Sequence, residues 1–444
     1  MRSRIFICLT FALTCPTLAL PQEVDQQTVN KLLQRLTDDE TRIKSLEAML
    51  ASMQANGAAP TAAPEPATAV AHELAAAGTA SAPAGTANPL AAALPDTEAT
   101  DHEHMMEVPG GPVLKFRGFF DLSFDTGSVA QNLQYPLGVP ATSSFRTGEF
   151  DLFMSSQLSP KLSFISEMVL STDPTNNFAI DLERYQLTYK QNKYFAISAG
   201  RYHTAIGYYN TAYHHGTWFS TATGRPFMYY FEDSGGVLPV HEVGVTSTGA
   251  VPSGKLDIHW TAEIGNGSAN AGSFYGDGVE NYVSNRNRKD VNFALYSRPE
   301  WLPGLQAGGS YLTGDLAPTG LPRVNQTVSS LYAVYVTSKW EFLNEAVILH
   351  HQFADGGQAF NSPMGYTQLA YTIGGKYRPY VRWQEVNMAA HDPVANFVGR
   401  YEGPSAGLRW DVFDYAALKL QYNRVFLRNA SAQNGLETAL AFTF

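Results

Sequence analysis

The chain has little cysteine and no long apolar run. Only two of its 444 residues are cysteines, Cys8 and Cys15. No stretch approaches the roughly 18 apolar residues that a membrane-spanning helix needs, so a helical inner-membrane transporter is not expected. Both cysteines lie in a segment that we expect to be cleaved. The mature chain is therefore predicted to have no disulfide and no cysteine-bound metal.

Residues 1–19 are predicted to be a cleaved secretory signal. Arg2 and Arg4 form a positive start, residues 5–13 are apolar, and small residues precede a cleavage site near Ala19. The alternative is a membrane anchor, for which this apolar run is too short. A secreted chain is expected.

Residues 20–54 are predicted to form a periplasmic coiled-coil helix. Apolar residues recur at two positions of a seven-residue repeat, and Asp39 is the polar occupant of the seam. The repeat consists of Val29, Leu32, Leu36, Ile43, Leu46, Leu50 and Met53. A lone amphipathic helix is the alternative. Because so short a seam needs partners to be stable, we expect an oligomer.

Residues 55–108 are rich in alanine, proline and threonine and lack an aliphatic pattern. This composition is typical of a disordered or semi-extended linker. His102 and His104 flank Glu103, but a solvated tail explains them more simply than a metal site. We predict no metal site here.

From residue 114 the pattern alternates with a period of two. Apolar residues at 114, 116, 118, 120, 122 and 124 interleave with polar ones, and similar alternation recurs at 255–264, 289–298 and 435–444. Such a period indicates strands with one apolar and one polar face. About 16 segments approach the ~10 residues that a tilted membrane strand needs.

The connectors between these segments alternate in length. The expected short connectors are Ser159-Pro160, 191–193, 250–254, 299–304, Gly374-Gly375 and Phe413-Asp414. The expected long connectors are 127–143, 172–178, 203–239, 266–288, 315–326, 354–364, 389–402 and 428–434. Such alternation is typical of an outer-membrane barrel, with turns in the periplasm and loops outside.

Aromatic residues gather beside the short connectors, as a membrane–water interface favours. They are Tyr189, Tyr194, Trp301, Trp340, Tyr377 and Tyr415. Residues 109–444 are therefore predicted to be all-β, a transmembrane antiparallel β-barrel of about 16 strands. A soluble sandwich or propeller is the alternative, but it would not combine this girdle with alternating connectors.

The connector 203–239 has neither a strand nor a helix period and contains nine aromatic residues. Long connectors of this kind are usually functional, and the aromatic content argues against disorder. We predict that it folds into the lumen as a constriction. Its aromatic candidates are Tyr208, Tyr209, Tyr213, Trp218, Tyr229 and Tyr230, which either stack on solutes or pack the loop against the wall.

Several segments resemble a known family. ISAGRYHTAIGYYN, followed after a long loop by VHEVGVTSTG, is similar to the phosphate-selective porin O/P family, as are KYRPYVRWQ and AGLRWD. The coiled coil before the barrel is similar to the DcaP-like porins. The final GLETALAFTF ends on Phe444 and resembles the signal read by the outer-membrane assembly machinery. The resemblance implies sixteen-stranded trimers whose third loop constricts each pore.

The charges depart from that family's phosphate-selective members. The 203–239 connector has one cation, Arg225, beside Glu232 and Asp233. Residues 109–444 hold 24 basic and 27 acidic residues, so phosphate specificity is not supported. The predicted pore-lining residues are Arg117, Arg225, Glu232, Asp233, Arg378, Arg382 and Arg409.

An enzyme is not expected. His214 and His215 lie near two carboxylates, but no nucleophile, base and orienting group have convincing spacing. We also expect no cofactor and no nucleic-acid partner.

The function expected is an outer-membrane porin for passive diffusion of small hydrophilic solutes. The expected partners are such solutes, outer-membrane lipid and two further copies in a homotrimer. The localisation is the outer membrane of a Gram-negative-type bacterium, with the N-terminal segment in the periplasm. The alternative is a closed structural barrel that tethers the membrane through its coiled coil.

Overall fold

The computed structural model describes the barrel region almost throughout. Its described residues are 44, 104–106, 112–127, 143–172, 177–213, 217–232, 236–268, 280–281, 284, 286–318, 321–395, 398–428 and 431–444. The predicted signal and coiled coil lie outside them, apart from Lys44. The chain divides into two compact units, Met1–Ala82 and Pro83–Phe444. The barrel belongs to the second unit.

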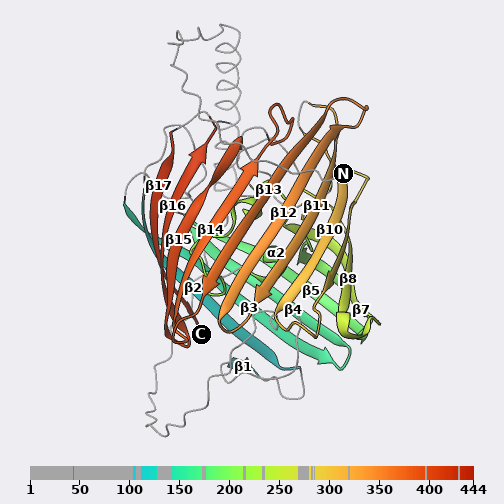
Figure 1. The fold of residues 1–444 in the computed structure, drawn as a ribbon. Helices are drawn as coiled ribbons and strands as arrows, with labels where there is room; N and C mark the ends of the chain where they lie inside the picture. Colours follow the sequence, from blue (N-terminus) through green and yellow to red (C-terminus); the bar gives the residue numbers. More distant parts are fainter. Residues whose placement is uncertain are drawn as a thin grey trace, which may run out of the picture. The chain divides into compact units, whose positions relative to one another are not determined.

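Strands β2 to β17 form one closed antiparallel barrel of 16 strands (Figure 1). The first eight are β2 (Leu114–Gly127), β3 (Ser144–Ser159), β4 (Leu162–Thr172), β5 (Phe178–Asn192), β6 (Phe195–His203), β7 (His241–Val251), β8 (Ile258–Gly265) and β9 (Asp290–Ser297). The others are β10 (Leu305–Leu316), β11 (Val324–Val336), β12 (Trp340–Phe353), β13 (Ala359–Tyr371), β14 (Tyr377–Asn387), β15 (Arg400–Phe413), β16 (Ala416–Leu427) and β17 (Gln433–Thr443). Each strand pairs with the next, and β17 pairs with β2. The predicted fold and strand number are confirmed.

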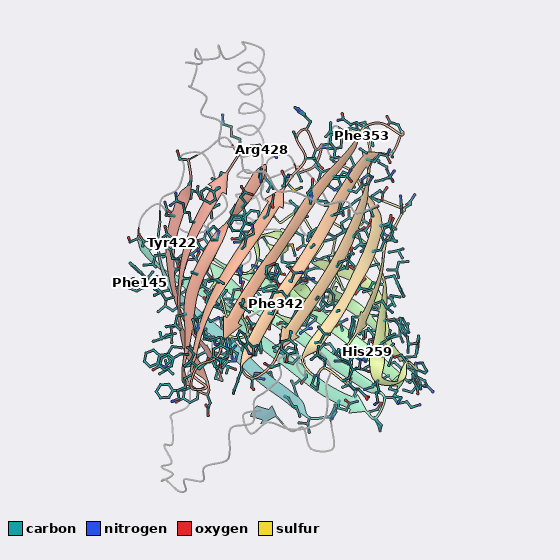
Figure 2. All side chains as sticks on the ribbon, in the orientation of Figure 1. Phe145, His259, Phe342, Phe353, Tyr422 and Arg428 are labelled. Carbon is teal, nitrogen blue, oxygen red and sulfur yellow. The ribbon has the colours of Figure 1, made fainter. Side chains whose placement is uncertain are left out.

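Alternate side chains of each strand point outward, and most of these outward side chains are apolar. On β12, Phe342 and Ile348 are exposed, whereas Leu343, Glu345 and Val347 between them are buried. Figure 2 labels Phe145, Phe342 and Tyr422, all exposed on the barrel wall. Period-two alternation in the sequence thus corresponds to the two faces of the wall.

Antiparallel pairing places the short connectors at one end of the barrel and the long ones at the other. The short connectors are 160–161, 193–194, 252–257, 298–304, 337–339, 372–376 and 414–415, and we call this end the turn end. The long connectors alternate with them, as predicted. Four end earlier than expected, since β11, β13, β15 and β17 begin before the ends predicted for the loops preceding them.

The connector 372–376 shows how the tight turns form. Gly374 and Gly375 both have positive φ, 59° and 71°. Glycine adopts this left-handed conformation without a Cβ clash, and consecutive positive φ values suit a tight hairpin turn.

A further strand, β1 (His104–Met106), pairs with Leu114–Phe116 of β2. The prediction of a linker over all of 55–108 was therefore wrong for these three residues. β17 pairs with β2 only from Phe119 onward. Before that point residues 114–116 of β2 pair with β1 instead, which gives the backbone groups of β1 hydrogen-bond partners.

Short helices occur only as connector turns within the described residues of the barrel. They are α2 (Tyr209–Ala212), η2 (Phe227–Tyr229) and η4 (Gly254–Leu256). No helix in the described part of the chain is long and apolar enough to cross a membrane.

Barrel closure depends on the last strand. Gly118 N donates to Phe444 O at 2.8 Å, and Phe444 N donates to Gly118 O at 3.0 Å. The Phe444 ring fills the space where a Cβ on residue 118 would stand. The absence of a side chain at Gly118 therefore accommodates the terminal ring.

Deleting residues 435–444 should prevent closure, because β16 and β2 would both be left as unpaired edges. We expect loss of the heat-modifiable band in electrophoresis and loss of membrane insertion. Normal insertion of the truncated chain would contradict the assigned role of β17.

Candidate functional site

The site is the connector between β6 and β7, residues 204–240, which we call the lumen loop. Its two ends are joined by a hydrogen bond from Thr204 N to Val240 O at 3.0 Å. The buried Asn210 amide donates to both Thr204 O and Val240 O at 2.9 Å. The loop thus begins and ends at one point of the wall.

Glu345 of β12 anchors the first part of the lumen loop. Its carboxylate accepts hydrogen bonds from Tyr208 N at 2.6 Å and Tyr209 N at 2.9 Å. It also accepts from the hydroxyls of Tyr229 at 2.8 Å and Tyr366 at 2.6 Å. Four donors on one buried carboxylate replace the water it would otherwise bind.

Three cations on β14 and β15 hold the middle of the loop. Arg409 donates to Trp218 O at 2.5 Å and Ser220 O at 2.9 Å. Arg382 donates to Gly224 O at 2.8 Å, and Arg378 lies 3.2 Å from the Thr221 hydroxyl. Arg382 and Arg409 are buried. Loop carbonyls cover Arg382 and Arg409, so these two predicted pore-lining residues contact the loop rather than open water.

Lys419 of β16 extends this set. Its ammonium donates to the carbonyls of Ser220 at 2.6 Å, Ala222 at 3.2 Å and Thr217. Carbonyl oxygens from an irregular backbone supply the acceptors that a buried ammonium needs. The loop backbone and the wall cations therefore satisfy each other.

Acidic side chains complete the attachment around the barrel. Thr221 donates to Glu341 at 2.8 Å, and Thr223 donates to Glu437 at 2.5 Å. The lumen loop thus reaches from β12 to β17.

The loop's tyrosines mostly pack rather than face solvent. Tyr208, Tyr209, Tyr213 and Tyr229 are 0–3% exposed and belong to one hydrophobic cluster with residues of the wall. Of the two roles predicted for these rings, the structure supports attachment of the loop to the wall. Trp218 and Tyr230 are only half-buried.

Arg225, the cation of the lumen loop, has few hydrogen-bond partners. Its guanidinium lies 3.6 Å from the centre of the Phe231 ring. Within the described residues its Nε and Nη2 atoms have no hydrogen-bond partner. Burial lowers the pKa of Arg225, whereas Tyr209 and nearby carboxylates oppose that shift. Arginine nevertheless stays charged in proteins, so this side chain places a positive charge in the lumen.

His241 of β7 links the end of the lumen loop to β5. Its Nδ1 lies 3.0 Å from Glu232, and its Nε2 lies 2.8 Å from Glu183. Its ring stacks on Phe231 at 5.7 Å. An imidazole donates through both nitrogens only when it is protonated. The bridge therefore uses the imidazolium form.

The wall opposite β12–β17 carries further charged pairs. Glu167 of β4 pairs with Arg184 of β5 at 3.0 Å. Near the turn end, Arg117 stacks on Phe119, which contacts Phe219 of the loop at 4.6 Å. The loop thus also touches β2.

Some predicted residues lie elsewhere. His214, His215 and Asp233 are outside the described residues. Arg286 belongs to the predicted long connector 266–288, where we expected an exposed arginine, but it is 3% exposed and lies within 4.0 Å of Glu280, Asp290 and Asp315. The reason is that the segment before β9 packs its guanidinium among carboxylates.

Glu345 and His241 were not predicted as site residues. Both faces of β12 mix apolar and polar residues, so alternation does not single out Glu345. His241 opens the β7 part of the VHEVGVTSTG segment, but nothing local in the sequence shows that it meets Glu183 and Glu232.

No protein-family model matches the chain, and no curated protein matches it. Solved structures do. The outer membrane channel DcaP of Acinetobacter baumannii is 8% identical, with a TM-score of 0.54 over 76% of this chain and 99% of that one. The anion-selective porin from Comamonas acidovorans is 12% identical, with a TM-score of 0.52 over 74% and 99%.

The chain has the fold of the outer-membrane porins. Within that group it resembles the DcaP-like channels, a likeness that the sequence analysis drew from the coiled coil predicted before the barrel. At these identities the likeness concerns the fold alone.

Glu345→Ala should release the first part of the lumen loop, because four donors lose their acceptor at a cost of about 3 kcal/mol. We expect faster chymotrypsin cleavage within 204–240 of the detergent-solubilised barrel. Glu385→Ala removes an exposed carboxylate of β14 and is the control. Unchanged protection of the Glu345 variant would contradict the anchor.

The His241 bridge should weaken as the pH rises, because a deprotonated imidazole can donate to only one of its two carboxylates. Chymotrypsin cleavage of the loop should increase with pH in the natural protein, from about pH 6 to about pH 9, around the range in which histidine titrates. Measured relative to cleavage of an unfolded peptide by the same chymotrypsin at each pH, the rate in His241→Phe should be higher throughout and independent of pH. The same pH dependence in that variant would assign the effect to another group.

Proposed function

We propose that the protein is an outer-membrane porin, a water-filled channel for passive diffusion of small hydrophilic solutes. The observation that carries the proposal is a closed barrel with an apolar outer face, enclosing a long loop bound to its inner wall. The apolar outer face suits lipid, and a closed ladder leaves no unpaired strand edge in it.

The lumen loop is the proposed constriction. Its attachment to β12–β17 supports this, because a loop crossing the lumen narrows the passage beside it. Arg225 and the half-buried Trp218 and Tyr230 are its proposed contacts with solute. Wall charges such as Arg184 and Glu167 would face the same passage. Because this lining would carry charges of both signs, we do not propose that the channel is specific for phosphate.

The proposed location is the outer membrane, with the turn end and both termini in the periplasm. Inserted barrels place their short turns on that side. A homotrimer remains the predicted assembly. Light scattering of the full-length protein in mild detergent tests it, and a monomer would overturn it.

Single-channel recording separates this proposal from a closed structural barrel. A porin in a planar bilayer gives ohmic steps in KCl, whereas a barrel plugged by its loop gives none. Absence of steps from correctly folded protein would overturn the channel.

Arg225→Glu should shift the channel toward cation preference. The residue lies near Glu149, Glu183 and Glu232, so the substitution adds a carboxylate to an acidic surround. The charge acts over less than the ~8 Å screening length of physiological salt. We expect the zero-current potential to move by about 10 mV, out of ~59 mV for ideal selectivity in a tenfold KCl gradient.

Two variants accompany this measurement. Arg225→Gln should give an intermediate shift because it removes the positive charge without adding a negative one. Arg288→Glu changes an exposed arginine at the end of the barrel opposite the turn end. Arg288 donates hydrogen bonds to Asn325 and Thr313, and its substitution should have little effect on selectivity. Equal shifts from Arg225→Glu and Arg288→Glu would contradict the constriction.

A further inference from the structure

Lysine is concentrated at the turn end of the barrel. Residues 109–444 contain nine lysines, and six of them lie in or beside the short connectors. These six are Lys161, Lys190, Lys193, Lys255, Lys339 and Lys376, and all are exposed. Within the described residues none of the six forms an ion pair. The turn end is therefore basic in a chain whose net charge is −10.

Two of these lysines, Lys161 and Lys193, form a cluster with two tyrosines on adjoining turns. Lys161 Nζ lies 3.2 Å from Gln191 Oε1, and the Tyr189 hydroxyl donates to the same oxygen at 2.6 Å. Lys190 N donates to Lys161 O at 2.8 Å, which holds the two turns together.

On the second of these turns, Lys193 Nζ lies 5.1 Å from the centre of the Tyr194 ring. We call Lys161, Lys193, Tyr189 and Tyr194 the lysine–tyrosine cluster. Its two rings are 42% and 43% exposed.

Apolar side chains continue from the cluster along the outer wall. Leu187 and Tyr189 lie two residues apart on β5 and are both exposed, and Phe195 and Ile197 of β6 are exposed beside them. Moving toward the turn end, the surface passes from apolar side chains to tyrosine rings and then to ammonium groups. A glycerophospholipid has the same order, from acyl chains through its ester region to its phosphate.

We propose that the lysine–tyrosine cluster binds the phosphate of an anionic glycerophospholipid in the leaflet around the turn end. The ammonium groups of Lys161 and Lys193, which form no ion pair with any described residue, supply the charge, and the tyrosine rings supply the interfacial surface. Continuity with the apolar outer wall favours a lipid over a soluble anion. The proposal rests on the proposed function only in that the barrel must span a membrane.

Native mass spectrometry of the full-length protein in neutral detergent tests the site. Phosphatidylglycerol and phosphatidylcholine with the same acyl chains are titrated separately. The natural protein should bind phosphatidylglycerol more tightly, and the double variant Lys161→Gln, Lys193→Gln should weaken that binding about tenfold.

The control double variant is Lys339→Gln, Lys376→Gln. It removes the same charge from the same end but leaves the cluster intact, so its affinity should change less than about threefold. Equal losses in the two variants would overturn the site in favour of diffuse attraction. Equal affinity for the two lipids would overturn it as well.

Inorganic phosphate separates a lipid site from a site for the free anion. Displacement of phosphatidylglycerol by millimolar phosphate at constant ionic strength would overturn the lipid assignment, and persistence of binding supports it. The cluster variant should keep its heat-modifiable band and its single-channel conductance. Failure of lipid binding with intact conductance would therefore leave the channel proposal standing.

Discussion

The structure depends on the pairing of β17 with β2. Sixteen strands satisfy one another's backbone groups only if the ring closes, since an open edge would leave a row of donors and acceptors without partners. The C-terminal residue, Phe444, takes part directly. Its backbone forms paired hydrogen bonds with Gly118, and its aromatic ring occupies the space that a side chain on residue 118 would need. Everything inside the barrel, including the path of the lumen loop, presupposes this closure.

Inside the ring, the wall and the lumen loop satisfy each other's polar groups. An irregular loop in an enclosed space has backbone groups that no ladder pairs, and buried wall charges need partners that water would otherwise provide. Glu345 takes two backbone amides and two tyrosine hydroxyls, while Arg409 and Lys419 take backbone carbonyls. The loop is consequently fixed by polar contacts as well as by its buried tyrosines. Arg225 stands apart because two of its nitrogens have no hydrogen-bond partner among the described residues.

The outer surface divides its chemistry by position along the strands. The middle of the wall is apolar, and the turn end carries tyrosine, tryptophan and exposed lysine. This arrangement serves a membrane boundary, where one side chain must contact both lipid and water. The lumen and the turn end would thus interact with different partners, a solute and a lipid, through separate sets of residues.

The sequence by itself determined the barrel, because period-two alternation and alternating connector lengths are local properties that can be read without knowledge of any contact. It placed Arg382 and Arg409 on the inner face and identified 203–239 as the long inner connector. It did not reveal that loop carbonyls cover those cations, that four tyrosines are buried, or that Arg286 lies among carboxylates. Only the tertiary structure decided these points, because most of them depend on contacts between residues more than a hundred positions apart, as between Tyr208 and Glu345. No pattern in the intervening chain encodes such a contact.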